Sequence, residues 1–561
     1  MITIKSVLKK IQQYKKVLII ANIVAIISTL LSLPVPLLIP LLIDEIILGK
    51  GGWITQNIDQ YITINSPEYY ILTVLIITIL FRAMSLLLNI LHIRLFTKIA
   101  KEVTYSIRKQ LLNRLQIVSM SEYDMLGSGA VSAKVITDVD TIDKFISSSV
   151  GEIIVEVLTL FGVSMIILYL NWQLALVILI LNPIALLFFV RVFRSIAKIK
   201  KKENRAIEVF QNSLTESLEL YNQIRVQNRE GYFLEDIDKK AKHIRDRAYM
   251  FGLRSEISLK FSQMLIMYSH DIFRSVGILM VLLGLLTIGK MLAIFAYAWV
   301  IMRPMDKLIN FTHLYFNAKT SIERLNEILN LGVETKYEEK VNPFTSEKTA
   351  SIRLENVSFS YDQNSEVLKN INLEIKQGEK VAIIGETGSG KSTLAQILIG
   401  LYPVNSGNIY YNDVEIKEMG YECVRSNVGF VIQSPMMFNN TLRFNLLLGK
   451  EHEDTVIYDI LKIVQLHDFV SKLSNGLDTI VGKNGTKLSG GQKQRLSIAR
   501  VLLDNPKVII FDESTSSLDN QTENRLLEAL SLYTQDKTII TIAHRKNSIE
   551  KADRIIDLDS L

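Results

Sequence analysis

Two glycine-rich stretches of the sequence could each hold a phosphate group. The first, GETGSGKST at Gly385–Thr393, follows the apolar run KVAII and precedes the helical pattern LAQILIGL. Its glycines let the backbone curl so that N–H groups point at phosphate oxygens, while Lys391 can reach the β- and γ-phosphates and Ser392 can coordinate Mg²⁺. The stretch therefore predicts a P-loop. Its predicted nucleotide-binding residues are Gly385, Glu386, Thr387, Gly388, Ser389, Gly390, Lys391, Ser392 and Thr393.

The second stretch is KLSGGQKQRL, Lys487–Leu496, in which a serine and two glycines come just before a helical pattern, GQKQRLSIARVLL. Backbone amides and the helix dipole attract an anion at such a position. The chain thus carries a second candidate phosphate cradle, far from the first in sequence. Its candidate nucleotide-binding residues are Ser489, Gly490, Gly491 and Gln492.

Two acidic residues end an apolar strand pattern further along, VIIFDE at Val508–Glu513. A buried strand would deliver Asp512 to a metal ion, and Glu513 could orient or deprotonate an attacking water. The run TIITIAH ends in a similar way at His544, which could reach a γ-phosphate. A purely structural role is the alternative for a histidine at the end of a strand.

These residues need a scaffold of strands and helices, and residues 351–561 have that texture. Short β-rich runs such as SIRLENVSFSY, KVAIIG, VGFVIQ, KVIIFDE and KTIITIAH alternate with helical stretches. The alternation predicts an α/β nucleotide-binding domain. Before it, residues 331–350 are charged, contain Pro343 and have few apolar side chains, which predicts a linker.

Residues 1–330 contain apolar runs long enough to cross a bilayer, which takes about 20 residues. We predict six transmembrane helices, near 17–48, 69–100, 146–170, 173–197, 257–288 and 291–312. Asn171–Trp172 joins the third helix to the fourth and Gly289–Lys290 the fifth to the sixth, so both connections should be tight turns. The predicted fold class is an α-helical polytopic membrane domain fused to an α/β P-loop domain.

The basic residues indicate the orientation of this membrane domain. Segments 1–16, 101–145 and 198–256 hold 24 Lys and Arg, whereas the opposite loops hold only Lys50 and Lys290. By the positive-inside rule, both termini and the ATPase domain should be cytoplasmic. The excess of basic residues is then explained by the membrane topology, so we expect no nucleic-acid partner. The single cysteine, Cys423, excludes an internal disulfide and a cysteine-cluster metal site.

Residues 351–561 resemble the nucleotide-binding domain of ABC transporters, because LSGGQ at Leu488–Gln492 is the signature of that family. Other motifs of the family stand in order around it. They are Tyr361 where an aromatic ring stacks on adenine, Gln433 as the Q-loop, Asp512–Glu513 as Walker B with the catalytic glutamate, Ser516–Asp519 as the D-loop and His544 as the switch histidine. The resemblance implies ATP as nucleotide, catalytic roles for Glu513, His544 and Gln433, and Mg²⁺ held by Ser392, Gln433 and Asp512.

The resemblance also answers why there are two cradles. In this family two domains dimerise head to tail, and the signature of one clamps the ATP held by the P-loop of the other. Intact motifs favour a homodimer, and a heterodimer with the degenerate motifs on the other chain is the alternative. Six spans before one such domain resemble the exporter (type IV) half-transporters. The resemblance implies two coupling helices, near Ser119–Leu126 and Glu219–Gln227. Each should rest on a nucleotide-binding domain.

Ionisable residues at membrane depth point to a substrate cavity, since an unpaired charge there is costly. The candidates are Arg82, His270, Asp271, Arg274 and Arg303. The alternative is a paired strut for Asp271 with Arg274 and a place near the cytoplasmic side for Arg303. We expect ATP-driven export or flipping of an amphiphilic peptide, lipid or lipid-linked molecule across a bacterial inner membrane. Multidrug efflux is an alternative. A channel or regulator gated by ATP, or an importer built on the exporter fold, are others.

Overall fold

The computed structural model describes residues 1–561 apart from 51, 61–66, 346–347, 362–365, 516, 544, 546–548 and 561. The side chains of residues 39, 41, 53–54, 149, 179, 181–195, 197, 262, 266, 303, 305–306 and 308–309 are also outside the description. The chain forms two compact units. The helical unit comprises Met1–Asn113 and Val131–Leu329, and the α/β unit comprises Arg114–Ala130 and Asn330–Leu561.

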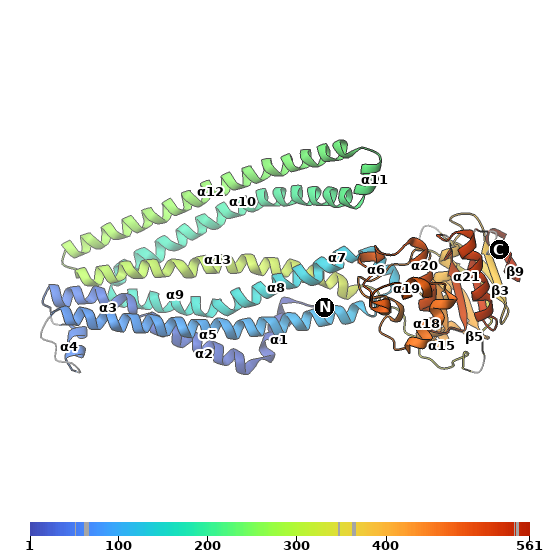
Figure 1. The fold of residues 1–561 in the computed structure, drawn as a ribbon. Helices are drawn as coiled ribbons and strands as arrows, with labels where there is room; N and C mark the ends of the chain where they lie inside the picture. Colours follow the sequence, from blue (N-terminus) through green and yellow to red (C-terminus); the bar gives the residue numbers. More distant parts are fainter. Residues whose placement is uncertain are drawn as a thin grey trace. The chain divides into compact units, whose positions relative to one another are not determined.

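The helical unit is built from long helices joined by short connections (Figure 1). The helices up to residue 330 are α1 (Ile4–Gln13), α2 (Lys15–Ser32), α3 (Val35–Leu42), η1 (Ile43–Ile47), α4 (Trp53–Asp59), α5 (Pro67–Leu115), α6 (Met120–Leu126), α7 (Ser128–Ala133), η2 (Lys134–Asp138), α8 (Val139–Lys144), η3 (Phe145–Val150), α9 (Gly151–Leu170), α10 (Trp172–Glu219), α11 (Tyr221–Val226), α12 (Glu230–Leu282) and α13 (Ile288–Asn330).

Four stretches of the described residues are long and apolar enough to cross a membrane: Lys15–Ile47, Pro67–Leu115, Ser128–Leu170 and Glu230–Leu282. A shorter apolar stretch, Ile288–Met302, begins α13. The remaining predicted span, 173–197, lies within α10. With 49 and 53 residues, α5 and α12 are much longer than the about 20 residues that a bilayer requires.

The predicted tight turn at Asn171 is confirmed. This residue alone separates α9 from α10, and its side-chain oxygen accepts a hydrogen bond of 2.9 Å from the backbone N–H of Leu174. The bond caps the first turn of α10, which otherwise leaves N–H groups without partners.

The predicted turn at Gly289–Lys290 was wrong, because these two residues lie in the first turn of α13. The chain reverses earlier, at Gly284, whose φ of +71° suits glycine. Asp44 explains why the helix already includes Gly289: its Oδ1 accepts a hydrogen bond of 2.8 Å from the Gly289 N–H. A carboxylate at a helix N-terminus is stabilised by the helix dipole.

His92 joins three helices of the helical unit. It lies in α5 and is 2% exposed. One ring nitrogen is 3.0 Å from the backbone oxygen of Ala21 in α2, and the other is 2.8 Å from that of Gly151 in α9. A Cβ atom at Gly151 would lie 2.9 Å from Phe96, so the close approach of α9 to α5 depends on glycine.

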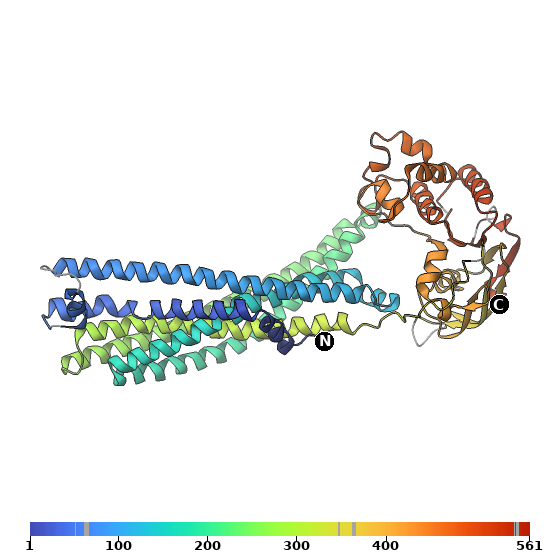
Figure 2. The ribbon, with the colours of Figure 1, turned by 90° about the horizontal axis from the view of Figure 1, so that it is seen from below.

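Helices α10 and α12 run side by side, and α11 closes the hairpin at its tip (Figures 1 and 2). The helix α11, Tyr221–Val226, falls within the second predicted coupling segment, Glu219–Gln227. Within this part of the chain, exposed charges pair along one helix, as in Lys239 with Glu235 at 2.8 Å.

The α/β unit contains two sheets. An antiparallel sheet has the order β2-β1-β4-β5, and a parallel sheet has the order β6-β7-β8-β3-β9. The strands are β1 (Ile352–Phe359), β2 (Leu368–Ile375), β3 (Lys380–Ile384), β4 (Ser406–Tyr411), β5 (Val414–Glu415), β6 (Val428–Val431), β7 (Val508–Asp512), β8 (Thr538–Ile542) and β9 (Arg554–Asp557). Every predicted β-rich run contains one of them. The carboxyl ends of β3, β6, β7 and β8 meet at one edge, where ligands of such sheets bind.

Helices pack on these sheets and carry the motifs between strands. They are α14 (Lys391–Leu398), α15 (Ile416–Met419), α16 (Tyr421–Asn427), α17 (Leu442–Leu447), α18 (Asp454–Ile463), α19 (His467–Ser471), η4 (Gly476–Asp478), η5 (Lys483–Gly485), α20 (Gly490–Leu503), α21 (Asn520–Tyr533) and η6 (Leu558–Ser560). Every residue of β7 is buried, so the strand that ends in Asp512 lies fully inside the unit.

The segment Arg114–Ala130 belongs to the α/β unit although it comes from the first third of the chain. Val118 pairs with Val333 in an isolated antiparallel bridge. The Ser119 N–H donates to the Gly332 oxygen at 3.0 Å, and the Glu334 N–H donates to the Ile117 oxygen at 2.8 Å. This short pairing holds α6, so a helix near Ser119–Leu126 is confirmed, while its coupling role stays a prediction.

The contacts of His92 generate a stability prediction. His92→Leu keeps the side-chain volume but removes both contacts to backbone oxygens, so we expect a loss of about 1–2 kcal/mol, at about 0.6 kcal/mol or more for each. Thermal unfolding of the purified protein in detergent measures it. His243→Leu, at an exposed position of α12, is the control and should not shift the midpoint. Equal midpoints for the two variants would contradict the role of His92.

Candidate nucleotide site

The P-loop forms the predicted turn between β3 and α14. Lys391 is buried, with 6% exposure, and its Nζ donates to the backbone oxygens of Gly385 at 2.9 Å and Glu386 at 2.6 Å. The ammonium group therefore lies within the curl of its own loop. Because these partners are neutral carbonyls, an anionic phosphate would be a stronger partner for the same ammonium group.

Two glycines of the loop are required by its shape. Gly385 has a φ of +151° and Gly390 a φ of +94°, both in the region that side chains disfavour. A Cβ atom at Gly390 would also lie 2.8 Å from Leu368. The loop thus fits against β2 only without a side chain at this position.

The outer side of the loop is anchored by Asp559, which sequence reasoning missed. Its Oδ2 accepts a hydrogen bond of 2.6 Å from the Glu386 N–H. Asp559 lies in η6, directly after β9, and β9 pairs with β3 in parallel. No motif marks this aspartate, because its role depends on the sheet order that places β9 beside β3.

The two acids of the Walker B segment are placed differently. Asp512 ends β7, is 4% exposed, and its Oδ1 accepts a hydrogen bond of 3.1 Å from the Ser392 hydroxyl. Glu513 has a φ of +44°, which is uncommon for a residue with a side chain and often marks a functional position. The Gln433 side-chain amide donates to Glu513 Oε2 at 2.5 Å. The sheet therefore brings Ser392, Asp512, Glu513 and Gln433 to one edge.

The signature is a helix N-terminus. Ser489 is the N-cap of α20, and its Oγ accepts a hydrogen bond of 3.2 Å from the Gln492 N–H. In return, Gln492 Oε1 accepts one of 2.8 Å from the Ser489 N–H. This capping box fixes the start of the helix. The following Gly490 and Gly491 leave the first two positions of the helix without side chains.

Neither α14 nor α20 has an acidic residue in its first turn, and α17 also lacks one, whereas α16, α18 and α21 each have one. The positive end of the dipole is thus left uncompensated in the two helices that follow glycine-rich loops. Within the described residues, no hydrogen bond joins Ser489–Gln492 to Gly385–Thr393. The two cradles of one chain are not combined into a single site by hydrogen bonds.

Two hydrogen bonds hold the D-loop. The Ser517 N–H donates to Gln494 Oε1 at 3.0 Å, and Arg545 donates to the Leu518 oxygen at 2.9 Å. Arg545 also pairs with Glu523, which is fully buried, at 3.2 Å. Two predicted motif residues, Ser516 and the switch histidine His544, lie outside the described residues.

Tyr361 lies beside the first turns of α14. Its hydroxyl is 3.0 Å from Thr393 Oγ1 and donates to Gln396 Oε1 at 2.9 Å. The side chain remains half exposed, and its ring contacts the rings of Phe359 and Tyr402. Such a ring, fixed at its hydroxyl and partly open to solvent, can stack on a planar base.

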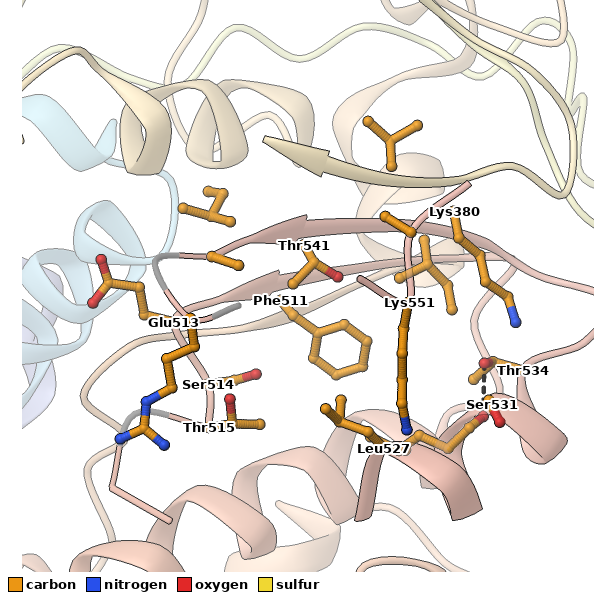
Figure 3. Close-up of a pocket in the computed structure, with 17 residues that line it drawn as sticks. Lys380, Phe511, Glu513, Ser514, Thr515, Leu527, Ser531, Thr534, Thr541 and Lys551 are labelled. Atoms are coloured by element: carbon orange, nitrogen blue, oxygen red, sulfur yellow. Dashed lines mark hydrogen bonds between the residues drawn. The ribbon is translucent and has the colours of Figure 1, made fainter. Parts of the chain in front are cut away.

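A pocket of about 180 Å³ lies between the strands β7 and β8 and the helix α21 (Figure 3). Glu513, Ser514 and Thr515 stand at one end of it, and Phe511 and Thr541 line its middle. No residue of the P-loop is among those that line it. The pocket is therefore separate from the phosphate cradle.

The candidate substrate residues lie in three helices of the helical unit. Asp271 and Arg274 form an ion pair of 3.6 Å on α12, yet both side chains are more than 60% exposed. The His270 ring contacts Trp299 of α13 edge to face, at 4.9 Å between ring centres. Arg82, on α5, is exposed. Arg303 lies in α13, and its side chain is outside the described residues.

A charge pair between helices was not predicted from the sequence. Lys307 of α13 donates to Glu152 of α9 at 2.5 Å. The pair matches neither the spacing of one helix nor a motif, so only the packing of α9 against α13 reveals it. Lys307 and Glu152 thus compensate each other rather than adding a net charge to a cavity.

The comparison with known proteins decides the family. Residues 18–305 match the family described as "ABC transporter transmembrane region", and residues 368–516 match the family described as "ABC transporter". This chain is an ABC transporter. It is an integral membrane protein that couples an ABC ATPase to export, so the predicted family and fold class are confirmed.

Several relatives of the transporter span most of both chains. "Putative multidrug export ATP-binding/permease protein YgaD" of Bacillus subtilis is 30% identical over 477 residues, which cover 82% of this chain and 80% of the relative. A protein of the same description from Staphylococcus aureus (strain NCTC 8325) is 31% identical over 471 residues, covering 82% and 80%. The solved "Structure of a bacterial Atm1-family ABC exporter with ATP bound" has a TM-score of 0.79 at 22% identity and covers 97% and 94%, which shows a shared fold.

The geometry of the P-loop predicts the effect of Gly390→Ala. The new Cβ would need φ near +94° and would press on Leu368, so the transporter should bind ATP at least tenfold more weakly. Binding of a fluorescent ATP analogue to the purified protein measures this. Gly378→Ala is the matched control, since Gly378 also has positive φ but nothing within 4 Å of the added atom. Equal affinities for both variants would refute the argument.

Proposed function

We propose that two copies of this transporter bind two ATP molecules head to tail, each between the P-loop of one copy and the signature of the other. The observation that carries the proposal is the signature helix. Its capped, glycine-rich start lacks any acid in the first turn, yet no hydrogen bond in the described residues joins it to the P-loop of its own chain. This anion site is separate from the phosphate cradle of its own chain. Its arrangement therefore fits a role in binding a phosphate that a second subunit holds.

Each residue then has a defined task. Lys391 exchanges its bonds to the loop carbonyls for phosphate oxygens, and the amides of Gly388 and Gly390 donate to the same group. The Ser389 N–H, which donates to the Glu386 oxygen at 3.2 Å, exchanges that bond in the same way. Tyr361 stacks on the base. Glu513 accepts a proton from the attacking water or orients it, while Gln433 holds the Glu513 carboxylate.

Ser392 and Asp512 fit the chemistry of a magnesium site. Their oxygens are 3.1 Å apart at the edge of the sheet, and hydroxyl and carboxylate oxygens are ligands that Mg²⁺ accepts beside phosphates and waters. Gln433 is the third candidate ligand. When bound, Mg²⁺ would neutralise part of the phosphate charge.

The proposal also covers the membrane in which the transporter lies and the class of its cargo. The transporter would lie in the plasma membrane of a bacterium, with both termini and the ATPase domain in the cytoplasm, because basic residues gather on that side. The cargo would be an amphiphile with a polar or anionic part, such as a peptide, a lipid or a lipid-linked molecule. Exposed Arg274 and Asp271 beside the His270–Trp299 contact offer both charge and aromatic surface in an apolar region.

Multidrug export is the second candidate, and the printed names of the relatives favour it. The contacts of His270 with Trp299 and Phe273 would then be the important part of the surface. Uptake of substrates into inverted membrane vesicles separates the possibilities. Accumulation of an amphiphile against its gradient, dependent on ATP, supports export of that class. Mere equilibration would indicate a gate, and accumulation only in right-side-out vesicles would indicate an importer.

Removing the Glu513 carboxylate should separate binding from hydrolysis. Glu513→Gln keeps the size and the contact with Gln433 but cannot accept a proton, so ATPase turnover should fall by about 10² or more while ATP remains bound. Retention of radioactive ATP on a filter and release of phosphate measure the two properties. Glu451→Gln, at an exposed position, is the control. Undiminished turnover in Glu513→Gln would refute the assigned role.

Changing the signature should stop hydrolysis without emptying the P-loop. Ser489→Arg removes the oxygen that caps α20 and introduces a long side chain where the phosphate of the other subunit would lie. We expect ATPase activity to be lost and nucleotide affinity to change less than threefold. Ser471→Arg, on an exposed turn of α19, is the control. Parallel loss of binding and hydrolysis would show that the signature does not act across a dimer.

A further inference from the structure

Three aromatic rings and one carboxylate connect the candidate base platform to the coupling helix α6. The Tyr361 ring meets the Tyr402 ring edge to face, with 5.3 Å between centroids and 85° between planes. The Tyr402 hydroxyl donates a hydrogen bond of 2.6 Å to Asp124 Oδ2. Phe359 packs against both tyrosine rings, at 4.9 Å from Tyr361 and 5.8 Å from Tyr402. All four residues belong to the α/β unit.

Tyr402 is well placed to transmit a displacement. It is 8% exposed and contributes to the hydrophobic core of the unit, so its ring cannot turn freely. Burial and the hydrogen bond to Asp124 raise the pKa of the Tyr402 hydroxyl, which therefore stays protonated and donates at neutral pH. A rigid ring between two partners couples their positions more strongly than an exposed side chain could.

The helix α6 has few other anchors. It contains no buried residue, and Gly127, with a φ of +75°, ends it. Its described contacts with the rest of the unit include the Ser119–Gly332 hydrogen bond at its N-cap, the Glu122 side chain beside Gly332, partial burial of Met120 against the core and the bond from Tyr402 to Asp124. Most residues of α6 are only partly buried, and Asp124 and Met125 are exposed, so the one hydrogen bond from the core to a carboxylate of this helix is a substantial part of its anchoring.

We propose that Tyr402 is a positioning residue that reports the nucleotide base to the coupling helix α6, through the ring of Tyr361 on one side and the carboxylate of Asp124 on the other. The proposal rests on the nucleotide site proposed above. A base stacked on Tyr361 restricts its ring, the edge-to-face contact restricts Tyr402, and the hydrogen bond then holds α6. The triphosphate alone lacks the group that would restrict Tyr361.

Hydrogen exchange of the complete transporter in lipid nanodiscs tests this. The Glu513→Gln background keeps the nucleotide intact, and the ligands are Mg·ATP and Mg·tripolyphosphate, which has the charges but no base. We expect both ligands to slow exchange in Gly385–Leu398. Only ATP should slow exchange in Met120–Leu126. Since both ligands bear the phosphates that the signature would clamp, their difference isolates the base.

Tyr402→Phe removes a single oxygen. We expect ATP to protect the P-loop as before, while the protection of α6 falls about tenfold, as loss of a hydrogen bond to a charged group implies. Tyr411→Phe is the matched control, because Tyr411 is also buried and donates at 2.7 Å, but to the Leu398 oxygen. It should leave α6 unchanged.

The partner is tested in the same way. Asp124→Leu should match Tyr402→Phe, and the double variant should be no worse, because both remove the same bond. Asp124→Asn keeps an acceptor oxygen and should restore most of the protection. By reciprocity, Asp124→Leu should weaken ATP binding and leave tripolyphosphate binding unchanged.

Two results would overturn the inference. One is equal protection of α6 by tripolyphosphate and ATP, which would make the phosphates the signal. The other is full protection of α6 by ATP in Tyr402→Phe. Failure of both ligands to protect the P-loop would instead overturn the proposed nucleotide site, so the two failures are distinguishable.

Discussion

The attraction between an anion and an uncompensated helix N-terminus is the interaction on which the proposed nucleotide site depends. Both α14 and α20 begin after glycines, lack an acid in the first turn and so leave several N–H groups and a positive dipole end for a ligand. The rest of the α/β unit positions the N-termini of these two helices. The parallel sheet fixes the first through β3, and the capping box of Ser489 and Gln492 fixes the second.

Much of the α/β unit could be predicted from the sequence, because its signals are local. Strand patterns of apolar residues, a glycine loop and a capped helix each depend on neighbours within about ten residues, and each is found where it was expected. The acids at the end of β7 follow the same rule. Once the strand is buried, Asp512 and Glu513 must emerge at the edge where β3 delivers the P-loop.

The parts that sequence reasoning missed all depend on contacts between distant segments. Asp559 reaches Glu386 because β9 pairs with β3, and Asp124 reaches Tyr402 because residues 114–130 pair with the chain after α13. The turn between α12 and α13 was misplaced for a similar reason, since Asp44 draws Gly289 into the helix from outside its own neighbourhood. The resemblance to exporters, not the periodicity, located α6.

The pairing of Val118 with Val333 means that the ATP-handling half of the transporter is not one continuous stretch of polypeptide. A recombinant fragment beginning after the membrane helices would leave behind the segment that covers Tyr402 and bridges the linker. In such a fragment the Tyr402 hydroxyl would lack its acceptor Asp124, and Val333 would lack its bridge partner Val118. Its kinetic properties would therefore be those of an incomplete domain. A chimaera that exchanges the ATPase domain between related exporters would need to include both segments of the α/β unit.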